Sequence, residues 1–130
     1  MLGMTENELS KTAVNAAFKI HSTLGPGLLE SAYEACLIYE LEGLGLNVKK
    51  QVSLPIIYEG ITLKVKYRID ILLDDKLIIE IKSVSMLNDV HLAQTLTYLK
   101  LTNLRLALLI NFNVPKIKDG IKRVINGNLD

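Results

Sequence analysis

The sequence predicts one α/β domain, in which a helix–strand–strand–strand–helix–strand core with a mixed, helix-flanked sheet follows an additional N-terminal helix. Apolar residues recur at helical spacing over residues 9–44, and β-branched residues accumulate over 48–84. A third helical periodicity then precedes an apolar run near the C-terminus. At 130 residues the chain has the size of one domain, so residues 1–130 are expected to form a single unit.

The first predicted helix covers about Thr5–Thr23. Thr5 and Glu8 have the spacing of a capping box, in which the two residues satisfy free N–H groups at the helix start. Gly25-Pro26-Gly27 should end this helix, and a second helix should follow as far as Gly43. The apolar face of the first helix would consist of Leu9, Ala13, Ala16, Ala17, Ile20 and Leu24.

Three strands are predicted next, over roughly Val48–Ile57, Ile61–Leu73 and Leu77–Val84. Turn-forming residues lie between them, at Glu59-Gly60 and at Asp74-Asp75. The first strand contains Pro55, which cannot donate a backbone hydrogen bond. That strand is therefore expected at an edge of the sheet.

The C-terminal part begins with a predicted helix. Asn88 is a suitable N-cap, and the apolar periodicity that follows it ends near Asn103. Leu106–Phe112 has the composition of a buried strand. The tail residues Ile121, Val124 and Ile125 fit either a short strand or a helical turn, and the sequence leaves both open.

Charge and hydropathy restrict the class of protein. Fifteen basic and fourteen acidic residues give a formal net charge of +1, so contact with nucleic acid would depend on a local patch. A hydrophobic content of 49% with only 5% aromatic residues favours a well-covered sheet and allows a homodimer interface. No apolar run approaches the ~18 residues of a membrane-spanning helix, and no signal peptide is apparent, so a cytoplasmic protein is expected.

Two carboxylates and a lysine interrupt the otherwise apolar second and third strands. If the turn between these strands centres on Asp75, paired positions sum to 150, and Asp70 faces Glu80 with their Cβ atoms ~5 Å apart. Lys82 has the same parity as Glu80 and lies on the same face about 6.6 Å further along. The pattern therefore predicts a compact cluster of two acids and one base.

Such a cluster suits a divalent cation. Two adjacent carboxylates repel each other unless a cation lies between them, and Mg²⁺ or Mn²⁺ prefers oxygen ligands. The backbone carbonyl of Ile81 could supply a further ligand oxygen. Bound metal lowers the pKa of water and neutralises charge that grows on a phosphodiester, and Lys82 would orient or deprotonate that water.

Each of these residues also has a simpler interpretation. Glu80 and Lys82 could form an exposed pair on a half-wet sheet, with Asp70 as their cross-strand partner. Glu30, in the first turn of the second helix, could merely complement the helix dipole. Gln94 and Tyr98 lie four residues apart and share one face of the third predicted helix, and by themselves they would be ordinary helix surface.

At the level of motifs, the chain resembles the GxxExxY proteins, small bacterial and archaeal proteins placed in the PD-(D/E)xK nuclease superfamily. Gly27-Leu28-Leu29-Glu30-Ser31-Ala32-Tyr33 matches the motif after which that family is named. The resemblance covers nearly the whole chain. It includes Thr5–Leu9, Ile20-His21, Leu24–Gly27 and Asn111–Asn113.

This resemblance implies a restriction-endonuclease-like fold and assigns roles to particular residues. It makes Asp70 the acid of the second core strand and Glu80-Ile81-Lys82 the signature of the third. Glu30 resembles the core-helix acid that holds the metal directly or through water. Gln94 and Tyr98 resemble the glutamine and tyrosine that position the site and substrate in RecB-like nucleases.

The function that follows is a Mg²⁺- or Mn²⁺-dependent nuclease that hydrolyses DNA, or alternatively RNA. A second hypothesis is a catalytically silent module on the same fold that binds nucleic acid or protein. The near-neutral charge and the few aromatic side chains available for base stacking favour that alternative. A third hypothesis is hydrolysis of a small phosphorylated molecule.

Overall fold

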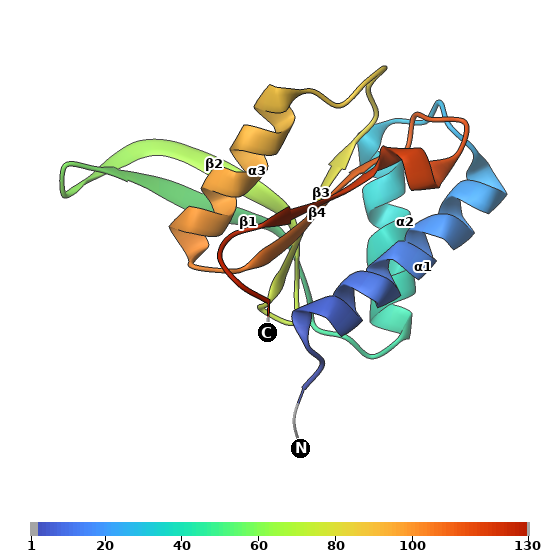
Figure 1. The fold of residues 1–130 in the computed structure, drawn as a ribbon, viewed down its shortest axis with the longest axis horizontal. Coiled ribbons are helices and arrows are strands. Elements are labelled where there is room, and N and C mark those ends of the chain that lie inside the picture. Colours follow the sequence, from blue (N-terminus) through green and yellow to red (C-terminus); the bar gives the residue numbers. More distant parts are fainter. Residues whose placement is uncertain (1–2, 130) are drawn as a thin grey trace.

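The computed structural model describes residues 3–129, with Lys66 described by its backbone alone. The predicted order of helices and strands is confirmed (Figure 1). In chain order the elements are α1 (Glu6–Leu24), α2 (Glu30–Gly43), β1 (Val48–Tyr58), β2 (Ile61–Leu73), β3 (Leu77–Lys82), α3 (Asp89–Thr102), β4 (Leu106–Asn111), the short 3₁₀ helix η1 (Ile117–Gly120) and β5 (Ile121–Ile125).

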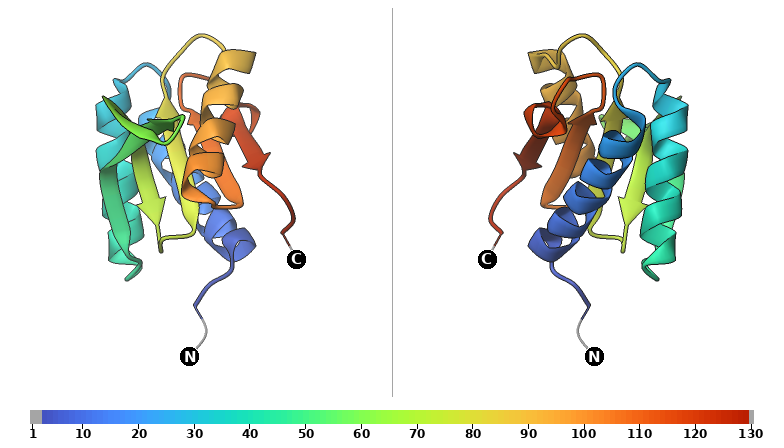
Figure 2. Two further views of the ribbon diagram at one scale, coloured as in Figure 1. Left: turned by 90° about the vertical axis from the view of Figure 1, so that its left-hand side faces the viewer. Right: turned by 90° about the vertical axis from the view of Figure 1, so that its right-hand side faces the viewer.

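The five strands form one mixed sheet in the order β1-β2-β3-β4-β5. Only β3 and β4 are parallel, and α3 is the crossover between them. Helices α1 and α2 cover one face of the sheet and α3 covers the other (Figure 2). The fold is therefore the predicted α/β architecture with a helix-flanked mixed sheet, and β1 lies at an edge, as Pro55 indicates.

Several local predictions are confirmed by hydrogen bonds. Thr5 and Glu8 form the capping box of α1. Asn88 caps α3 and exchanges hydrogen bonds with His91, while Asn103 ends the helix in the left-handed conformation. The tail, which the sequence left open, forms strand β5 because it pairs antiparallel with β4.

At two element boundaries a side chain takes the backbone groups. The Tyr33 hydroxyl donates to the Gly25 carbonyl (2.6 Å) and accepts from the Leu28 N–H (3.2 Å), and α2 begins at Glu30, which agrees with the prediction that Glu30 lies in its first turn. Strand β3 ends at Lys82 rather than Val84. The Asn111 side-chain amide bonds both the N–H and the carbonyl of Val84 (3.1 and 3.0 Å), which directs the chain out of the sheet.

The core has two parts because β3 and β4 are buried on both faces. All six residues of β4 and the first five of β3 are buried. The larger cluster lies under α1 and α2, and the smaller one lies under α3. Glu80 is the only charged side chain inside β3 and β4 that is fully buried, at 4% exposure, so its burial requires an explanation.

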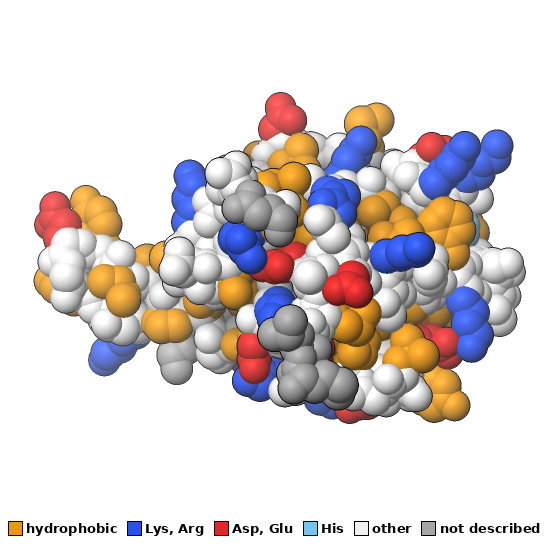
Figure 3. Space-filling view, turned by 60° about the horizontal axis from the view of Figure 1, so that its bottom comes forward, with side chains coloured by type: hydrophobic (Ala, Val, Ile, Leu, Met, Phe, Trp, Pro, Cys, Tyr) orange, Lys and Arg blue, Asp and Glu red, His pale blue; other side chains and the backbone are white. Residues whose placement is uncertain are grey.

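The hairpin formed by β1 and β2 projects beyond the rest of the sheet (Figure 1). Its outer part carries exposed apolar side chains, including Ile57, Tyr58, Ile61 and Val65. In the view of Figure 3 this arm extends from the body of the molecule, with apolar side chains along it. No helix within residues 3–129 is both long enough and apolar enough to cross a membrane.

Gly120 gives a test of the packing between η1 and β4. A Cβ atom at this position would lie 2.1 Å from the backbone carbonyl oxygen of Asn111, which cannot move without disturbing β4. We expect Gly120→Ala to lower the free energy of unfolding by roughly 2–3 kcal/mol, measured by urea denaturation. Gly43→Ala is the matched control, since nothing lies within 4 Å of the added atom there, and an equal loss in both variants would contradict the packing argument.

Candidate active site

The predicted cross-strand register between β2 and β3 is confirmed. Ile71 pairs with Ile79, and Leu73 pairs with Leu77, so paired residue numbers sum to 150. Asp70 and Glu80 follow directly after the last of these pairs. The cluster therefore begins where the ladder between the two strands ends.

Beyond the ladder, the two carboxylates replace the backbone pairing. The Glu80 carboxylate accepts a hydrogen bond from the Asp70 backbone N–H (2.8 Å). The Asp70 carboxylate accepts one from the backbone N–H of Ile81, also at 2.8 Å. Each acid therefore holds the strand that carries the other, which fixes both carboxylates close together.

Burial disfavours the ionised forms of both acids. Burial, together with the negative charge of Asp70, raises the pKa of Glu80 from 4.5 to about 8. Burial also raises the pKa of Asp70, although the Ile81 N–H acts in the opposite direction. The Lys82 ammonium lowers both pKa values, so it lies near both acids. The site consequently combines two desolvated carboxylates with one neighbouring positive charge.

Stability should depend on pH through Glu80. Because its folded-state pKa lies near 8 and its ordinary value is 4.5, the folded chain binds this proton more tightly than the unfolded chain. The protonated Glu80 therefore adds to the free energy of unfolding. This added stability is fully present below about pH 4.5 and is lost as the pH rises through about 8. Each unit of difference between the folded and unfolded pKa corresponds to about 1.4 kcal/mol. In urea denaturation with a chelator, Glu80→Gln should therefore show a weaker decline over that range than the wild type.

A control for this pH dependence is Glu42→Gln, which removes an exposed acid at the end of α2. It should decline with pH in the same way as the wild type. Parallel pH curves for the wild type and Glu80→Gln would contradict the assignment of the effect to Glu80.

Glu30 reaches the cluster from the start of α2. Its carboxylate accepts a long hydrogen bond from the Ser83 N–H (3.3 Å), directly after β3, and its charge raises the pKa of Asp70. Gly27, with φ +101°, and Tyr33 shape the loop that brings it there. The Tyr33 ring stacks on Phe112 with centroids 4.4 Å apart. In the sequence motif, Gly27 and Tyr33 are thus structural, whereas Glu30 faces the site.

Helix α3 contributes Tyr98 from the opposite face of the sheet. Its side chain is buried, and burial together with the charges of Glu80 and Asp70 raises its pKa to about 12. Its ring centroid lies 6.1 Å from that of Tyr67. Gln94 lies one turn earlier on the same helix and is half-buried, but among the described residues its side chain has no hydrogen bond. Tyr98 therefore joins the cluster, and Gln94 is linked to it only by helix position.

Two residues that the sequence did not single out also contact the site. The Gln51 side-chain amide donates to Glu34 (2.7 Å) and to Asp70 (3.4 Å). Glu34 lies four residues after Glu30 in α2, so helical spacing could have identified it. Gln51 could be found only from the register of β1 with β2. Its neighbours Lys50 and Val52 pair with Ile71 and Ile69.

Comparison with known families agrees with this arrangement. The family model described as PD-(D/E)XK nuclease superfamily matches residues 7–124. The chain belongs to this superfamily. No curated protein and no solved structure matches the chain. The narrower resemblance to GxxExxY proteins stays a prediction.

PD-(D/E)XK nucleases typically use divalent metals, and the residues present fit such an ion. Among residues 3–129 no group of three or more His, Cys, Asp and Glu side chains surrounds a common point. Mg²⁺, however, keeps several waters and needs only one or two protein carboxylates. Asp70 and Glu80 would supply those two. Ile81 contributes its N–H to Asp70, and the role of its carbonyl as a ligand stays a prediction.

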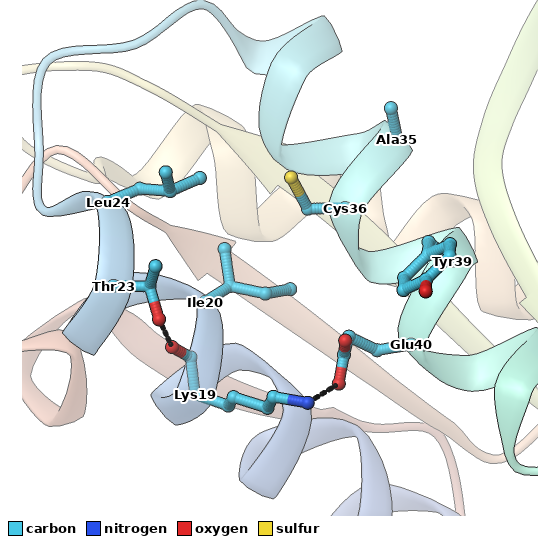
Figure 4. A pocket seen from close by; sticks show the side chains of 8 residues that line it. All are labelled: Lys19, Ile20, Thr23, Leu24, Ala35, Cys36, Tyr39 and Glu40. Carbon is cyan, nitrogen blue, oxygen red and sulfur yellow. Dashed lines mark hydrogen bonds and ion pairs between the residues drawn. The ribbon is translucent and has the colours of Figure 1, made fainter.

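Two surface hollows lie beside α2, where Glu30 and Glu34 approach the candidate site. One, of about 380 Å³, is lined by Glu30 and Ser83, and another, of about 470 Å³, is lined by Glu34, Lys50 and Gln51. A different groove of about 410 Å³ lies between α1 and α2 (Figure 4). The Lys19–Glu40 ion pair (2.8 Å) lies along it, and no site residue lines it. The groove between α1 and α2 is therefore separate from the carboxylate cluster.

Proposed function

We propose that this chain is a Mg²⁺- or Mn²⁺-dependent nuclease that hydrolyses phosphodiester bonds in DNA. The observation that carries the proposal is the pair of Asp70, which is partly buried, and Glu80, which is buried. Each carboxylate accepts a backbone N–H of the neighbouring strand at the end of the ladder, near Lys82 and Glu30. Two neighbouring acids repel each other when both are ionised, and a bound divalent cation would remove that repulsion. Membership of the PD-(D/E)XK superfamily supports the same reaction class.

Each residue of the cluster has a part in this proposal. Asp70 and Glu80 would hold the metal, with the Ile81 carbonyl as a further ligand and Glu30 as a ligand directly or through water. When bound, the metal would supply neutralisation of the phosphate and a more acidic water. Lys82 would hold the attacking water and accept or share its proton. Gln94 and Tyr98 would position the substrate and the strand that carries Glu80.

Purified wild-type protein should cleave DNA when Mg²⁺ or Mn²⁺ is present. Single-stranded, duplex and branched oligonucleotides with labelled ends, together with a matching RNA, should be incubated with each metal and with a chelator. We expect product with at least one DNA substrate, with loss of product on chelation. Absence of metal-stimulated cleavage of every substrate would contradict the proposal.

A silent binding module is the second candidate. The observation that favours it is the projecting β1–β2 arm with exposed Ile57, Tyr58 and Ile61, because contiguous exposed apolar surface commonly marks a contact with another molecule. A homodimer through this surface would be one form of that function. Under this alternative, Asp70→Asn would leave binding of nucleic acid or protein unchanged, and metal would not alter stability.

A further inference from the structure

Gln51 has an unusual backbone conformation. Its φ is +50°, in the left-handed region that residues other than glycine rarely adopt. Glu59, Asp74 and Asp75 also have positive φ, but they belong to hairpin turns, and Asn103 caps a helix. Among the described residues, Gln51 is the one non-glycine with positive φ inside a strand, which is where such a conformation needs a reason.

At this position the side chains of β1 and β2 change from one face of the sheet to the other. In a regular strand, residues two apart lie on the same face. In β1, however, Val48 packs with the cluster under α1 and α2, whereas Val52 and Leu54 pack with the cluster under α3. In β2, Ile71 belongs to the first cluster and Ile69 to the second. Both strands therefore change face between the same two rungs, at Gln51 and Asp70.

The side chain of Gln51 connects this reversal to the acids. Its amide nitrogen donates to the Glu34 carboxylate of α2 (2.7 Å) and to the Asp70 carboxylate (3.4 Å). The other oxygen of Asp70 accepts from Ile81. Asp70 is thus held from two sides, by β3 through a backbone group and by β1 through the Gln51 amide.

We infer that Gln51 is a positioning residue for the candidate metal site. Its left-handed backbone lets β1 follow β2 through the change of face, and its amide fixes the orientation of the Asp70 carboxylate between α2 and β3. The inference rests on the proposed function, since it concerns how the metal ligand is held. It assigns to Gln51 no contact with metal or substrate.

Two substitutions, Gln51→Gly and Gln51→Asn, separate the role of the Gln51 backbone from the role of its amide. Gln51→Gly removes the amide and relaxes the backbone, because glycine adopts positive φ without steric cost. Gln51→Asn retains an amide on a residue that tolerates the left-handed region, but its side chain is one methylene shorter, so we expect its amide not to reach both carboxylates. The matched control is Ser53→Gly, two residues along the same strand at an exposed position without positive φ.

The experiment measures the Mn²⁺ affinity of the metal-free proteins by titration calorimetry, and their thermal midpoints without metal. We expect Gln51→Gly to unfold at or above the wild-type temperature yet to bind Mn²⁺ about 10-fold more weakly, as for loss of other residues that orient a metal ligand. Gln51→Asn should also bind more weakly. Ser53→Gly should unfold at a lower temperature and bind Mn²⁺ as tightly as the wild type.

Wild-type Mn²⁺ affinity in Gln51→Gly would overturn the inference while leaving the proposed function intact. A lower thermal midpoint with unchanged affinity would also overturn it, because Gln51 would then be purely structural. Failure of the wild type itself to bind Mn²⁺ would overturn the proposed function, and the role of Gln51 with it.

Discussion

Asp70→Asn is expected to reduce metal-dependent DNA cleavage at least ~10³-fold, equivalent to about 4 kcal/mol of transition-state stabilisation. The substitution removes one of the two charges that would hold the metal. It keeps an oxygen that can accept the Ile81 N–H, so the join between β2 and β3 should survive. End-labelled oligonucleotide cleavage at saturating wild-type metal concentration measures the effect.

Without metal, the same substitution should make the protein more stable. Because Asp70 and Glu80 are neighbouring desolvated acids, removal of one charge should raise the thermal midpoint in chelator. Added Mn²⁺ should then stabilise the wild type by about 2.7 kcal/mol at roughly 100 times Kd, and should leave Asp70→Asn unchanged. Equal stabilisation of both proteins would contradict the assignment of Asp70 as a ligand.

Asp75→Asn is the matched control for Asp70→Asn. It removes an acid from the same hairpin, but from an exposed ion pair with Lys49 (2.7 Å), and such pairs contribute little to stability. Cleavage and Mn²⁺ stabilisation should both match the wild type.

Lys82→Met is expected to lower the cleavage rate about 10²- to 10⁴-fold while the protein still binds Mn²⁺. Methionine has a similar length but no charge and no proton to exchange. Because the ammonium lies near both acids and repels a cation, its removal should leave Mn²⁺ affinity unchanged or increase it. Single-turnover cleavage and titration calorimetry together separate the chemical step from binding.

The control for Lys82→Met is Lys11→Met, which removes an exposed lysine of α1 far along the chain from the cluster. Cleavage by this variant should equal that of the wild type. Lys82→Met could instead lose Mn²⁺ affinity by a large factor and lose cleavage rate by the same factor. That result would show that Lys82 acts through the metal and not on the attacking water.

Periodicity and turn residues predicted most of the fold because they are local signals. The caps at Thr5 and Asn88, the edge position of β1 and the β2–β3 register all follow from residues close together in the sequence. The end of β3 could not be predicted in the same way, because Asn111 controls it from a strand 27 residues away.

The sequence by itself determined that Asp70, Glu80 and Lys82 form one cluster, because a short hairpin with alternating side chains brings them together. Only the tertiary structure decided how the acids are held. The exchange of side-chain and backbone hydrogen bonds, the approach of Glu30 and the face reversal at Gln51 depend on packing between distant segments. Burial of Glu80 is also a tertiary property, since the strands and helix that desolvate it lie elsewhere in the chain.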